Sequence, residues 1–394
     1  MLTNRQLFLL HNAQTSTSPL MLEVVKAEGN YLFDAEGKKY LDLISGISVS
    51  NTGHRHPRVL AAIRHQIDQY LHTMVYGEYV QSPQTLLAKK LNDLLPNHGS
   101  FDQQPWASYF TNSGSEATEG AMKLAKRYTG KQGFVSFKNA YHGSTQGALS
   151  LMDAEDFKNP FRPLLPGVQH LDFNAIYGLK NITTATAAAF VEMVQSESGY
   201  IPADIDFIKA LRKRCTETGT LLVVDECQTG LGRTGSFFAF EKHGIVPDII
   251  LLAKALGGGM PMGAFVASKP IMDCLSHNPA LGHITTFGGH PVCCAAALEN
   301  ISVLEDEKLL ETVSEKEKLF RNELTGLSVS GSGLMLSIDL DKFENCKRII
   351  DTCLAKGILS DWFLHAPNKL RIAPPLTISP EEIKWVCGVI LESV

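Results

Sequence analysis

Residues 221–226 read Leu-Leu-Val-Val-Asp-Glu, and residues 251–256 read Leu-Leu-Ala-Lys-Ala-Leu. Each stretch is a short apolar run that ends at a charged side chain, Asp225 in the first and Lys254 in the second. Polar loops or amphipathic segments separate most such runs. Near-continuous apolar strands that alternate with helices predict an α/β fold with a mostly parallel sheet covered by helices. The other apolar runs of this region are residues 107–111, 133–137, 187–192 and 263–267.

The segments outside this region have a different pattern. Residues 23–43 alternate short strand-like runs with turns, which predicts a small antiparallel meander. After Pro291, a long helical region leads to strands near residues 335–340 and 369–372 and to a closing helix from Pro380. A chain of 394 residues exceeds the size at which a single core stops growing, so we expect one large domain and a smaller one.

Composition and charge restrict the class of partner. Hydrophobic residues make up 44% of the chain and charged residues 20%, as in globular proteins with a full core. The net charge of -5 argues against nucleic acid or an anionic membrane, because both require a basic face. The sequence has no signal-peptide pattern, no apolar run of about 18 residues and no C-x-x-C pair among its cysteines. We therefore expect a soluble, cytoplasmic protein with reduced thiols.

Ligands of open α/β sheets collect at the carboxyl ends of the strands, so polar residues that follow strands are candidates for a site. Residues 111–116, Thr-Asn-Ser-Gly-Ser-Glu, lie between an expected strand and an expected helix. Gly114, between Ser113 and Ser115, offers free backbone N–H groups and the positive end of a helix dipole to a phosphate. The alternative is ordinary helix capping, because Ser113 and Glu116 have the spacing of a capping box.

Three further residues follow strands in the same region. Asp225 ends a buried run, where a carboxylate is costly without a cationic partner, and its alternative role is a cap. Lys254 precedes the glycines 257–259, which leave room for a flat ligand; the alternative is a lysine that extends to the surface. Tyr141, within residues 139–143, either stacks on such a ligand or packs in the core.

Together these four clusters match the requirements of pyridoxal 5'-phosphate (PLP). The cofactor has a phosphate, a flat ring, a pyridine nitrogen and an aldehyde. A phosphate cradle, an aromatic side chain, an acid and a lysine serve these groups in turn. The acid keeps the ring nitrogen protonated, and the lysine holds the aldehyde and later moves a proton.

Two other motifs indicate different chemistry and are weaker. Residues 230–235 match the dinucleotide pattern G-x-G-x-x-G, but four residues separate them from the strand end at Asp225. No strand that ends in an acid follows at the expected distance. His54 and His56 suggest a metal, but two ligands without others nearby favour an ordinary loop. We therefore predict neither NAD binding nor a metal site.

With these residues in place, the chain resembles the class III aminotransferases among the fold-type I PLP enzymes, and in particular the acetylornithine, ornithine and 4-aminobutyrate aminotransferases. The resemblance implies a large PLP-binding domain of residues 49–288 and a smaller α+β domain built from residues 1–48 and 289–394. The stretches that carry it are residues 37–42, 53–57, 112–117, 141–143, 225–230, 254, 285–289 and 370–375.

The resemblance also implies a role for each residue of the cofactor site. Lys254 would carry PLP as a Schiff base, and Asp225 would pair with the pyridine nitrogen. Gln228 would contact the phenolic oxygen, while Tyr141 and Cys227 would pack on the two faces of the ring. The other residues implied at the phosphate or around the ring are Ser113, Gly114, Ser115, His142 and Glu192.

Substrate and partner contacts follow from the same resemblance. Arg371 would clamp a substrate carboxylate, and Glu197 would mask that arginine when the far end of a substrate carries an amine. Thr286 would reach the phosphate of the neighbouring subunit, which implies a homodimer with shared active sites.

Two residues depart from the nearest relatives. Ser144 stands where they usually have an arginine that binds a second carboxylate, so a bidentate clamp is missing. Ile47 stands where the ornithine enzymes have a tyrosine that helps to hold substrate. The substrates of those relatives therefore cannot be carried over. Gln228 argues against the aminomutase and diaminopelargonate branches, which have other residues at that position.

We expect a PLP-dependent transaminase that moves an amino group from an amine or ω-amino acid donor to a 2-oxo acid, 2-oxoglutarate or pyruvate. Three alternatives remain open on the sequence alone. A dialkylglycine-decarboxylase-like enzyme would use the same Lys254 and Asp225. An NAD-dependent oxidoreductase would use residues 230–235, and a non-catalytic binding protein would keep only the fold.

Overall fold

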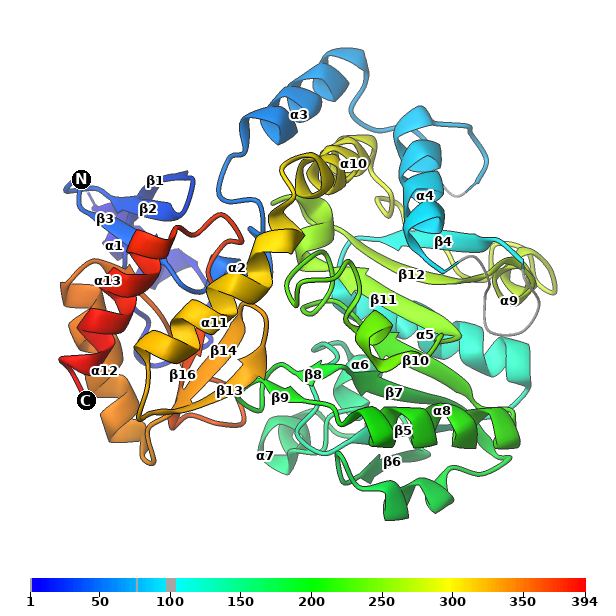
Figure 1. Ribbon diagram of the computed structural model, residues 1–394. Coiled ribbons are helices and arrows are strands. Elements are labelled where there is room, and N and C mark those ends of the chain that lie inside the picture. The colour runs from blue at the N-terminus through cyan, green and yellow to red at the C-terminus, as the bar shows by residue number, and fades with distance from the viewer. Residues whose placement is uncertain (1, 76, 97–103) are drawn as a thin grey trace.

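A seven-stranded sheet forms the centre of the larger part of the molecule in the computed structural model, which describes residues 2–75, 77–96 and 104–394 (Figure 1). The strand order is β4-β12-β11-β10-β7-β5-β6. β12 is antiparallel to both of its neighbours, β4 and β11, and all other pairs are parallel, so the predicted mostly parallel α/β sheet is confirmed. The strands are β4 (Trp106–Thr111), β5 (Gly133–Phe137), β6 (Val168–Leu171), β7 (Thr186–Glu192), β10 (Leu221–Asp225), β11 (Ile249–Ala253) and β12 (Gly263–Ser268).

Helices cover both faces of this sheet because successive side chains of each strand point in opposite directions. Leu221 and Val223 of β10 pack in the cluster under α5 (Gly114–Thr129), whereas Leu222 and Val224 pack in the cluster that contains residues of α8 (Ile205–Thr218). The helix α5 lies very close to the sheet. A Cβ added at Gly120 would be only 2.2 Å from the ring of Phe265, so this position requires glycine.

The edge strand β6 was not predicted, and its sequence explains why. Two polar residues, Gln169 and His170, separate the apolar Val168 and Leu171, and only Leu171 is buried. The central strands β10 and β11 are buried at every position, which gives the continuous apolar runs seen in the sequence. The register pairs Asp225 with Glu192 on β7, so these two acids lie level with one another, whereas it pairs Asp225 with Leu251 on β11, so that Lys254 lies further along the sheet edge.

The two ends of the chain fold together in the smaller part of the molecule. The predicted meander is present as β1 (Val24–Glu28), β2 (Tyr31–Asp34) and β3 (Lys39–Asp42). A fourth strand, β15 (Ile358–Leu359), joins this sheet parallel to β3. A second, antiparallel sheet consists of β13 (Ser328–Ser332), β14 (Met335–Asp339) and β16 (Lys369–Ile372).

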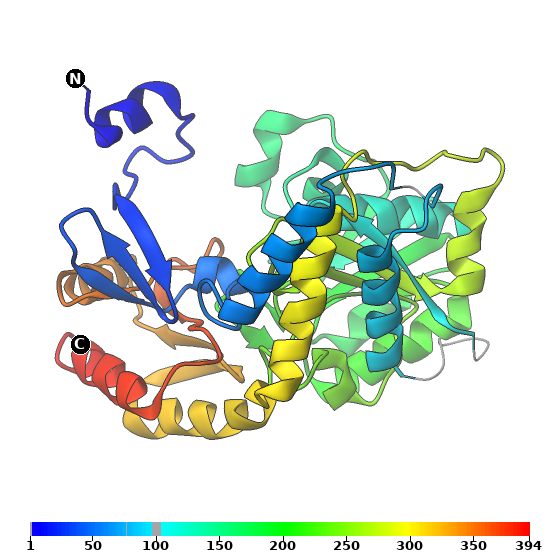
Figure 2. The same ribbon diagram turned by 90° about the horizontal axis from the view of Figure 1, so that it is seen from above.

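The helices of this part are α11 (Val313–Glu323), α12 (Phe343–Ala355) and α13 (Pro380–Leu391). A long helix, α10 (Pro291–Asp306), connects them to the large sheet and runs beside α3 (Pro57–Gln69) (Figure 2). α10 also packs on α4 (Ser82–Leu94). The division into residues 1–48, 49–288 and 289–394 stays a proposal. The pairing of β15 with β3 supports it, because this pairing joins the first and third segments in one sheet. The packing of α10 does not follow from it, because α10 belongs to the third segment but packs on α3 and α4 of the second. The short elements are α1 (Asn4–His11), α2 (Ser45–Ser48), α6 (Gln146–Ser150), α7 (Glu155–Lys158), α9 (Lys269–Asp273), β8 (Val194–Gln195) and β9 (Ile201–Pro202).

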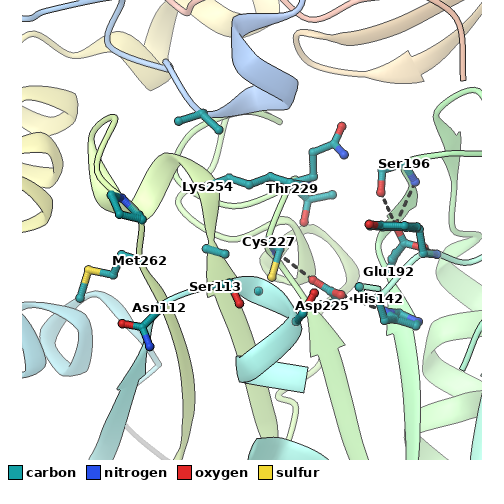
Figure 3. Close-up of a pocket in the computed structure, with 18 of the residues that line it drawn as sticks. Asn112, Ser113, His142, Glu192, Ser196, Asp225, Cys227, Thr229, Lys254 and Met262 are labelled. Atoms are coloured by element: carbon teal, nitrogen blue, oxygen red, sulfur yellow. Dashed lines mark hydrogen bonds and ion pairs between the residues drawn. The ribbon is translucent and has the colours of Figure 1, made fainter. Parts of the chain in front are cut away.

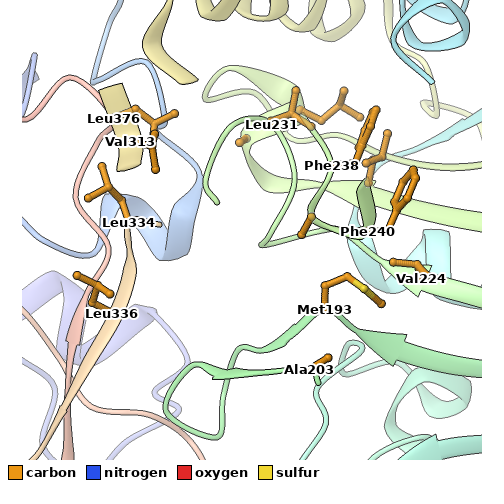
Figure 4. Close-up of a cluster of buried hydrophobic side chains, with 14 of the residues drawn as sticks. Met193, Ala203, Val224, Leu231, Phe238, Phe240, Val313, Leu334, Leu336 and Leu376 are labelled. Carbon is orange, nitrogen blue, oxygen red and sulfur yellow. The ribbon is translucent and has the colours of Figure 1, made fainter. Parts of the chain in front are cut away.

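The glycine-rich loop of residues 230–235 belongs to the contact between the two parts. It is a series of turns and does not begin a helix, so it lacks the helix N-terminus that a dinucleotide pyrophosphate would need. A Cβ on Gly232 would lie 2.9 Å from Leu310 and 3.0 Å from Leu376, because the loop packs tightly on the smaller part. Figure 4 shows the surrounding apolar cluster, in which side chains such as Leu231 face side chains such as Leu334 and Leu376.

Two observations concern the whole described chain. All eight cysteines are free thiols in the structure. Within the described residues, no helix combines the length and the apolar character that crossing a membrane requires.

Arg233, from the glycine-rich loop, is fully buried and ties the two parts together. Its guanidinium donates hydrogen bonds to the carbonyl oxygens of Leu334 (3.1 Å) and Pro374 and to the side chain of Asn51. A guanidinium suits three acceptors that lie in different directions, since it has five donors in a fixed planar arrangement.

We expect Arg233→Ala to lower the free energy of unfolding by ~3 kcal/mol or more, because three buried acceptors lose their donor. Urea denaturation followed by circular dichroism measures the change. Arg64→Ala, at an exposed position of α3, is the matched control and should change the value by less than about 0.5 kcal/mol. Equal stabilities of the two variants would contradict the bridging role of Arg233.

Candidate active site

A cavity of about 490 Å³ lies at the carboxyl ends of β7, β10 and β11 (Figure 3). All four clusters predicted from the sequence contribute to its wall, together with residues from other loops. The wall consists of Val49, Asn112, Ser113, Gly114, Ser115, Tyr141, His142, Gly143, Glu192, Ser196, Asp225, Cys227, Gln228, Thr229, Ala253, Lys254, Gly259, Met260, Pro261 and Met262.

Asp225 is a buried carboxylate held by two donors. Its Oδ2 is 2.8 Å from Nδ1 of His142, and its Oδ1 accepts a hydrogen bond from the Cys227 amide at 2.9 Å. Burial raises the pKa of Asp225, but the hydrogen bond and charge of His142 together with the Cys227 contacts outweigh it, so the pKa lies below its ordinary value. Asp225 is therefore ionised at neutral pH, and His142 is the cationic partner that a buried carboxylate needs.

Glu192 lies beside Asp225 at the end of the neighbouring strand. It accepts hydrogen bonds from the backbone and hydroxyl of Ser196 and from the Tyr141 amide at 3.2 Å. Burial, with repulsion from Asp225, raises its pKa although His142 and Ser196 lower it. The two neighbouring acids thus have pKa values that are shifted in opposite directions, and Glu192 fixes the loop that carries Tyr141.

Lys254 follows the last residue of β11 directly. Its backbone has φ +50°, in the left-handed region that non-glycine residues seldom adopt, and such strain concentrates at functional sites. Its ammonium group has neither a hydrogen bond nor an ion pair with any residue in the described ranges. The amine is therefore available to react within the cavity.

The loop before α5 forms a narrow end of the cavity. Ser113 caps the helix by accepting a hydrogen bond from the Glu116 amide at 3.2 Å, whereas the Glu116 carboxylate accepts from the Asn112 amide at 2.7 Å. The capping prediction is thus confirmed for Ser113. In a capping box the Glu116 carboxylate would accept from the Ser113 amide, whereas here it accepts from the amide of the preceding residue. A Cβ on Gly114 would lie 3.2 Å from the sulfur of Cys227 and 3.3 Å from Cβ of Ala253, so glycine allows these residues to pack closely against the start of α5.

The loop around Gly143 completes this end of the site. Gly143 has φ +127°, and a Cβ there would lie 2.4 Å from Oγ of Ser115. The Ser144 amide donates to that same Oγ at 3.2 Å, and the Ser144 hydroxyl is 2.9 Å from the Tyr141 hydroxyl. Ser144 therefore orients Tyr141 through its hydroxyl and Ser115 through its amide.

Arg371 lies next to the cavity, on β16 of the smaller part, and is almost completely buried. Its Nη2 is 3.0 Å from Oε2 of Glu197, so the predicted pair is present. A second acid, Asp361, binds Nε at 2.7 Å. Burial raises the pKa of Asp361 to about 6, with a further increase from Glu197, although Arg371 lowers it. The guanidinium also stacks on Phe363, with 4.3 Å to the ring centroid.

Five predicted residues are not part of the cavity wall: Glu197, Arg371 and Ser144, described above, and also Thr286 and Ile47. Thr286 is exposed on the loop before α10. Ile47 belongs to α2, where the four consecutive residues from Ser45 to Ser48 all have positive φ. Such a left-handed turn is costly for a β-branched residue, and Val49, two residues further on, lines the cavity instead.

Several site residues could not be found from the sequence. Asp361 and Tyr200, which both bind Arg371, lie in irregular segments and belong to no local motif. Asn112, Ser196 and Thr229 are adjacent to predicted residues, and proximity to the strand ends was the only available signal. Residues 259–262, which begin at the last of the glycines after Lys254, close one side of the cavity.

The observed groups fit PLP. The amide nitrogen of Gln228 is buried and has no hydrogen-bond partner among the described residues, so it is free to donate to a ligand. An anion-binding helix start, an ionised buried acid and a free amine surround the same space. The start of α5 at Gly114 and Ser115 lines the cavity and suits a phosphate, and the apolar side chain of Cys227 suits the face of a ring.

Comparison with known proteins identifies the family. The sequence model of the class-III aminotransferases matches residues 12–394. The chain is 40% identical to the acetylornithine aminotransferase of Methanocaldococcus jannaschii, over 92% of this chain and 91% of the relative. It is 38% identical to the putrescine aminotransferase of Pectobacterium atrosepticum, over 90% and 78% respectively. The solved ornithine aminotransferase of Toxoplasma gondii, in which PLP partially occupies the active site, superposes with a TM-score of 0.89, at 29% identity over 98% of this chain and 92% of that one. The chain therefore belongs to the class III aminotransferases, enzymes of fold type I that use PLP.

Proposed function

We propose that this aminotransferase moves an amino group from an amine or ω-amino acid donor to a 2-oxo acid, with Lys254 and Asp225 as the catalytic residues. The observation that carries the proposal is that a free amine and an ionised, buried carboxylate from neighbouring strands line one cavity. Relatives named for acetylornithine, ornithine and putrescine support a donor that carries an amine far from any carboxylate.

The chemistry of the residues that line the cavity indicates which of them would hold each part of PLP. Lys254 would form the covalent bond to the aldehyde carbon, and the N–H groups at the start of α5, with Ser115, would bind the phosphate. The Tyr141 and Cys227 side chains would cover the ring, and Gln228 would donate to its phenolic oxygen. When bound, PLP supplies a ring that withdraws electrons from the substrate carbon and so stabilises negative charge there.

Asp225 and Lys254 would divide the proton chemistry between them. Asp225 is ionised and fixed by His142, so it would hold a proton on the ring nitrogen. Lys254 Nζ, released when the donor amine takes its place, would accept a proton from the substrate carbon and deliver it to the carbon on the other side of the substrate nitrogen. The strained backbone of Lys254 fixes the point from which its side chain reaches into the cavity.

Arg371 and Glu197 support the proposed range of substrates. With Glu197 on its Nη2 atom, Arg371 is neutralised and suits a donor without a carboxylate at that end. If Glu197 turns away, Arg371 can bind the carboxylate of a 2-oxo acid such as 2-oxoglutarate or pyruvate. Ser144 offers no second cationic clamp. We further propose a homodimer with shared active sites, which the exposure of Thr286 outside this chain's own cavity supports.

We expect Lys254→Ala to lower turnover at least ~10³-fold, because the variant lacks both the covalent anchor and the proton carrier. Borohydride treatment of the wild type with PLP should fix the cofactor's mass on the peptide that contains Lys254, and the variant should not be labelled. Lys209→Ala, at an exposed position of α8, is the control. Normal turnover in Lys254→Ala would remove this lysine from the mechanism.

Asp225→Asn should keep the yellow colour of bound PLP but lower kcat by roughly 10²–10³-fold, since a neutral amide cannot hold the ring nitrogen protonated. Absorbance spectra and steady-state kinetics on the same preparations separate cofactor binding from chemistry. If kcat remains that of the wild type, the role assigned to Asp225 is wrong.

Glu197→Gln tests the proposed switch. Without its negative charge, Arg371 is less well masked, so kcat/KM for a donor without a carboxylate should fall about tenfold relative to kcat/KM for glutamate. A panel of amines and ω-amino acids, with 2-oxoglutarate or pyruvate as acceptor, supplies the ratio. Glu381→Gln on the exposed start of α13 should leave it unchanged. An unaltered ratio in Glu197→Gln would contradict the masking function.

A further inference from the structure

Tyr200 lies between the substrate arginine and the cofactor side of the cavity and is completely buried. Its ring meets Phe363 edge-on, with 4.7 Å between ring centroids. Its backbone has φ +50°, and its carbonyl oxygen accepts a hydrogen bond from the Ser330 hydroxyl at 2.9 Å. Contacts from β13 and from the segment before β16 therefore fix the position of this side chain.

The hydroxyl of Tyr200 connects two functional side chains. Nη1 of Arg371 lies 3.2 Å from the hydroxyl oxygen, and that oxygen lies 2.9 Å from Oε1 of Gln228. A guanidinium can only donate, so Tyr200 accepts from Arg371. Its own proton then points to Gln228. Burial raises the pKa of Tyr200 although Arg371 lowers it, so the hydroxyl keeps this proton at neutral pH.

This direction also fixes the orientation of the Gln228 amide. If the amide were turned over, its NH₂ group would face a hydroxyl whose proton would have no acceptor there. With Oε1 bound to Tyr200, the amide nitrogen turns away from Tyr200, and it has no hydrogen-bond partner in the part of the chain that the structure describes. Because Gln228 lines the cavity, this nitrogen is the donor that is presented to a ligand there.

We propose that Tyr200 is a positioning residue, which acts through Gln228 and links it to Arg371. By holding Oε1, its hydroxyl commits the amide nitrogen of Gln228 to the cofactor, and the positive charge of Arg371 polarises that hydroxyl in a site of low dielectric. The substrate-binding arginine and the cofactor environment thereby share one hydrogen-bond chain. This inference rests on the proposed binding of PLP in the cavity.

The experiment is a double-mutant cycle on the PLP-loaded enzyme, with Tyr200→Phe, Gln228→Leu and the double variant. Tyr200→Phe removes one oxygen and keeps the ring against Phe363. We expect it to raise the PLP dissociation constant roughly 3- to 10-fold, to change the visible spectrum of bound PLP and to lower kcat. In the Gln228→Leu background, the same substitution should change PLP affinity by less than about twofold, because the residue that it positions is gone.

The matched control is Tyr40→Phe, which removes a buried hydroxyl that binds Asp34 at 2.8 Å on the N-terminal sheet. Tyr40→Phe should lower the free energy of unfolding by about as much as Tyr200→Phe does, while the affinity for PLP and the spectrum of bound PLP stay unchanged. A wild-type spectrum and affinity in Tyr200→Phe would overturn the proposal, as would an undiminished effect in the Gln228→Leu background. If instead the wild type forms no borohydride-stable bond at Lys254, the proposed function itself fails.

Discussion

The ionised carboxylate of Asp225 at the buried end of β10 is the constraint around which the site is arranged. A carboxylate without water is unfavourable unless donors surround it, and here His142 and the Cys227 amide supply them. This requirement explains why a histidine is buried beneath the cavity, and why the loop that carries Tyr141 is anchored to Glu192 on the adjacent strand. The site is thus a consequence of stabilising one charge at the edge of a sheet.

Local sequence was sufficient to predict the sheet and the main chemical groups. β10 and β11 are buried on both faces, so their residues are continuously apolar and the interruption at Asp225 and Lys254 stands out. Parallel strands place their carboxyl ends at one edge, which brings interruptions that are distant in sequence into one cavity. The residues of the helix start at Ser113 and Gly114 were found for the same reason.

Features that depend on long-range packing could not be predicted. β6 lies at the edge and lacks an apolar run, and the two-residue strand β15 has no periodicity of its own. Asp361 and Tyr200 contact Arg371 only because segments from both parts of the molecule converge on it. The Glu116 carboxylate accepts a hydrogen bond from the Asn112 amide and not from the Ser113 amide. The spacing of a capping-box motif does not distinguish between these two neighbouring donors.

The parallel pairing of β3 with β15 has a consequence for biosynthesis. β3 ends at Asp42 and β15 begins at Ile358, so the strand partner of the N-terminal meander emerges from the ribosome only after most of the polypeptide has been made. The seven strands of the central sheet are all available by Ser268 and can form beforehand. The edge of β3 in the nascent meander stays unpaired throughout that interval, and it can pair with strands of other chains until β15 covers it.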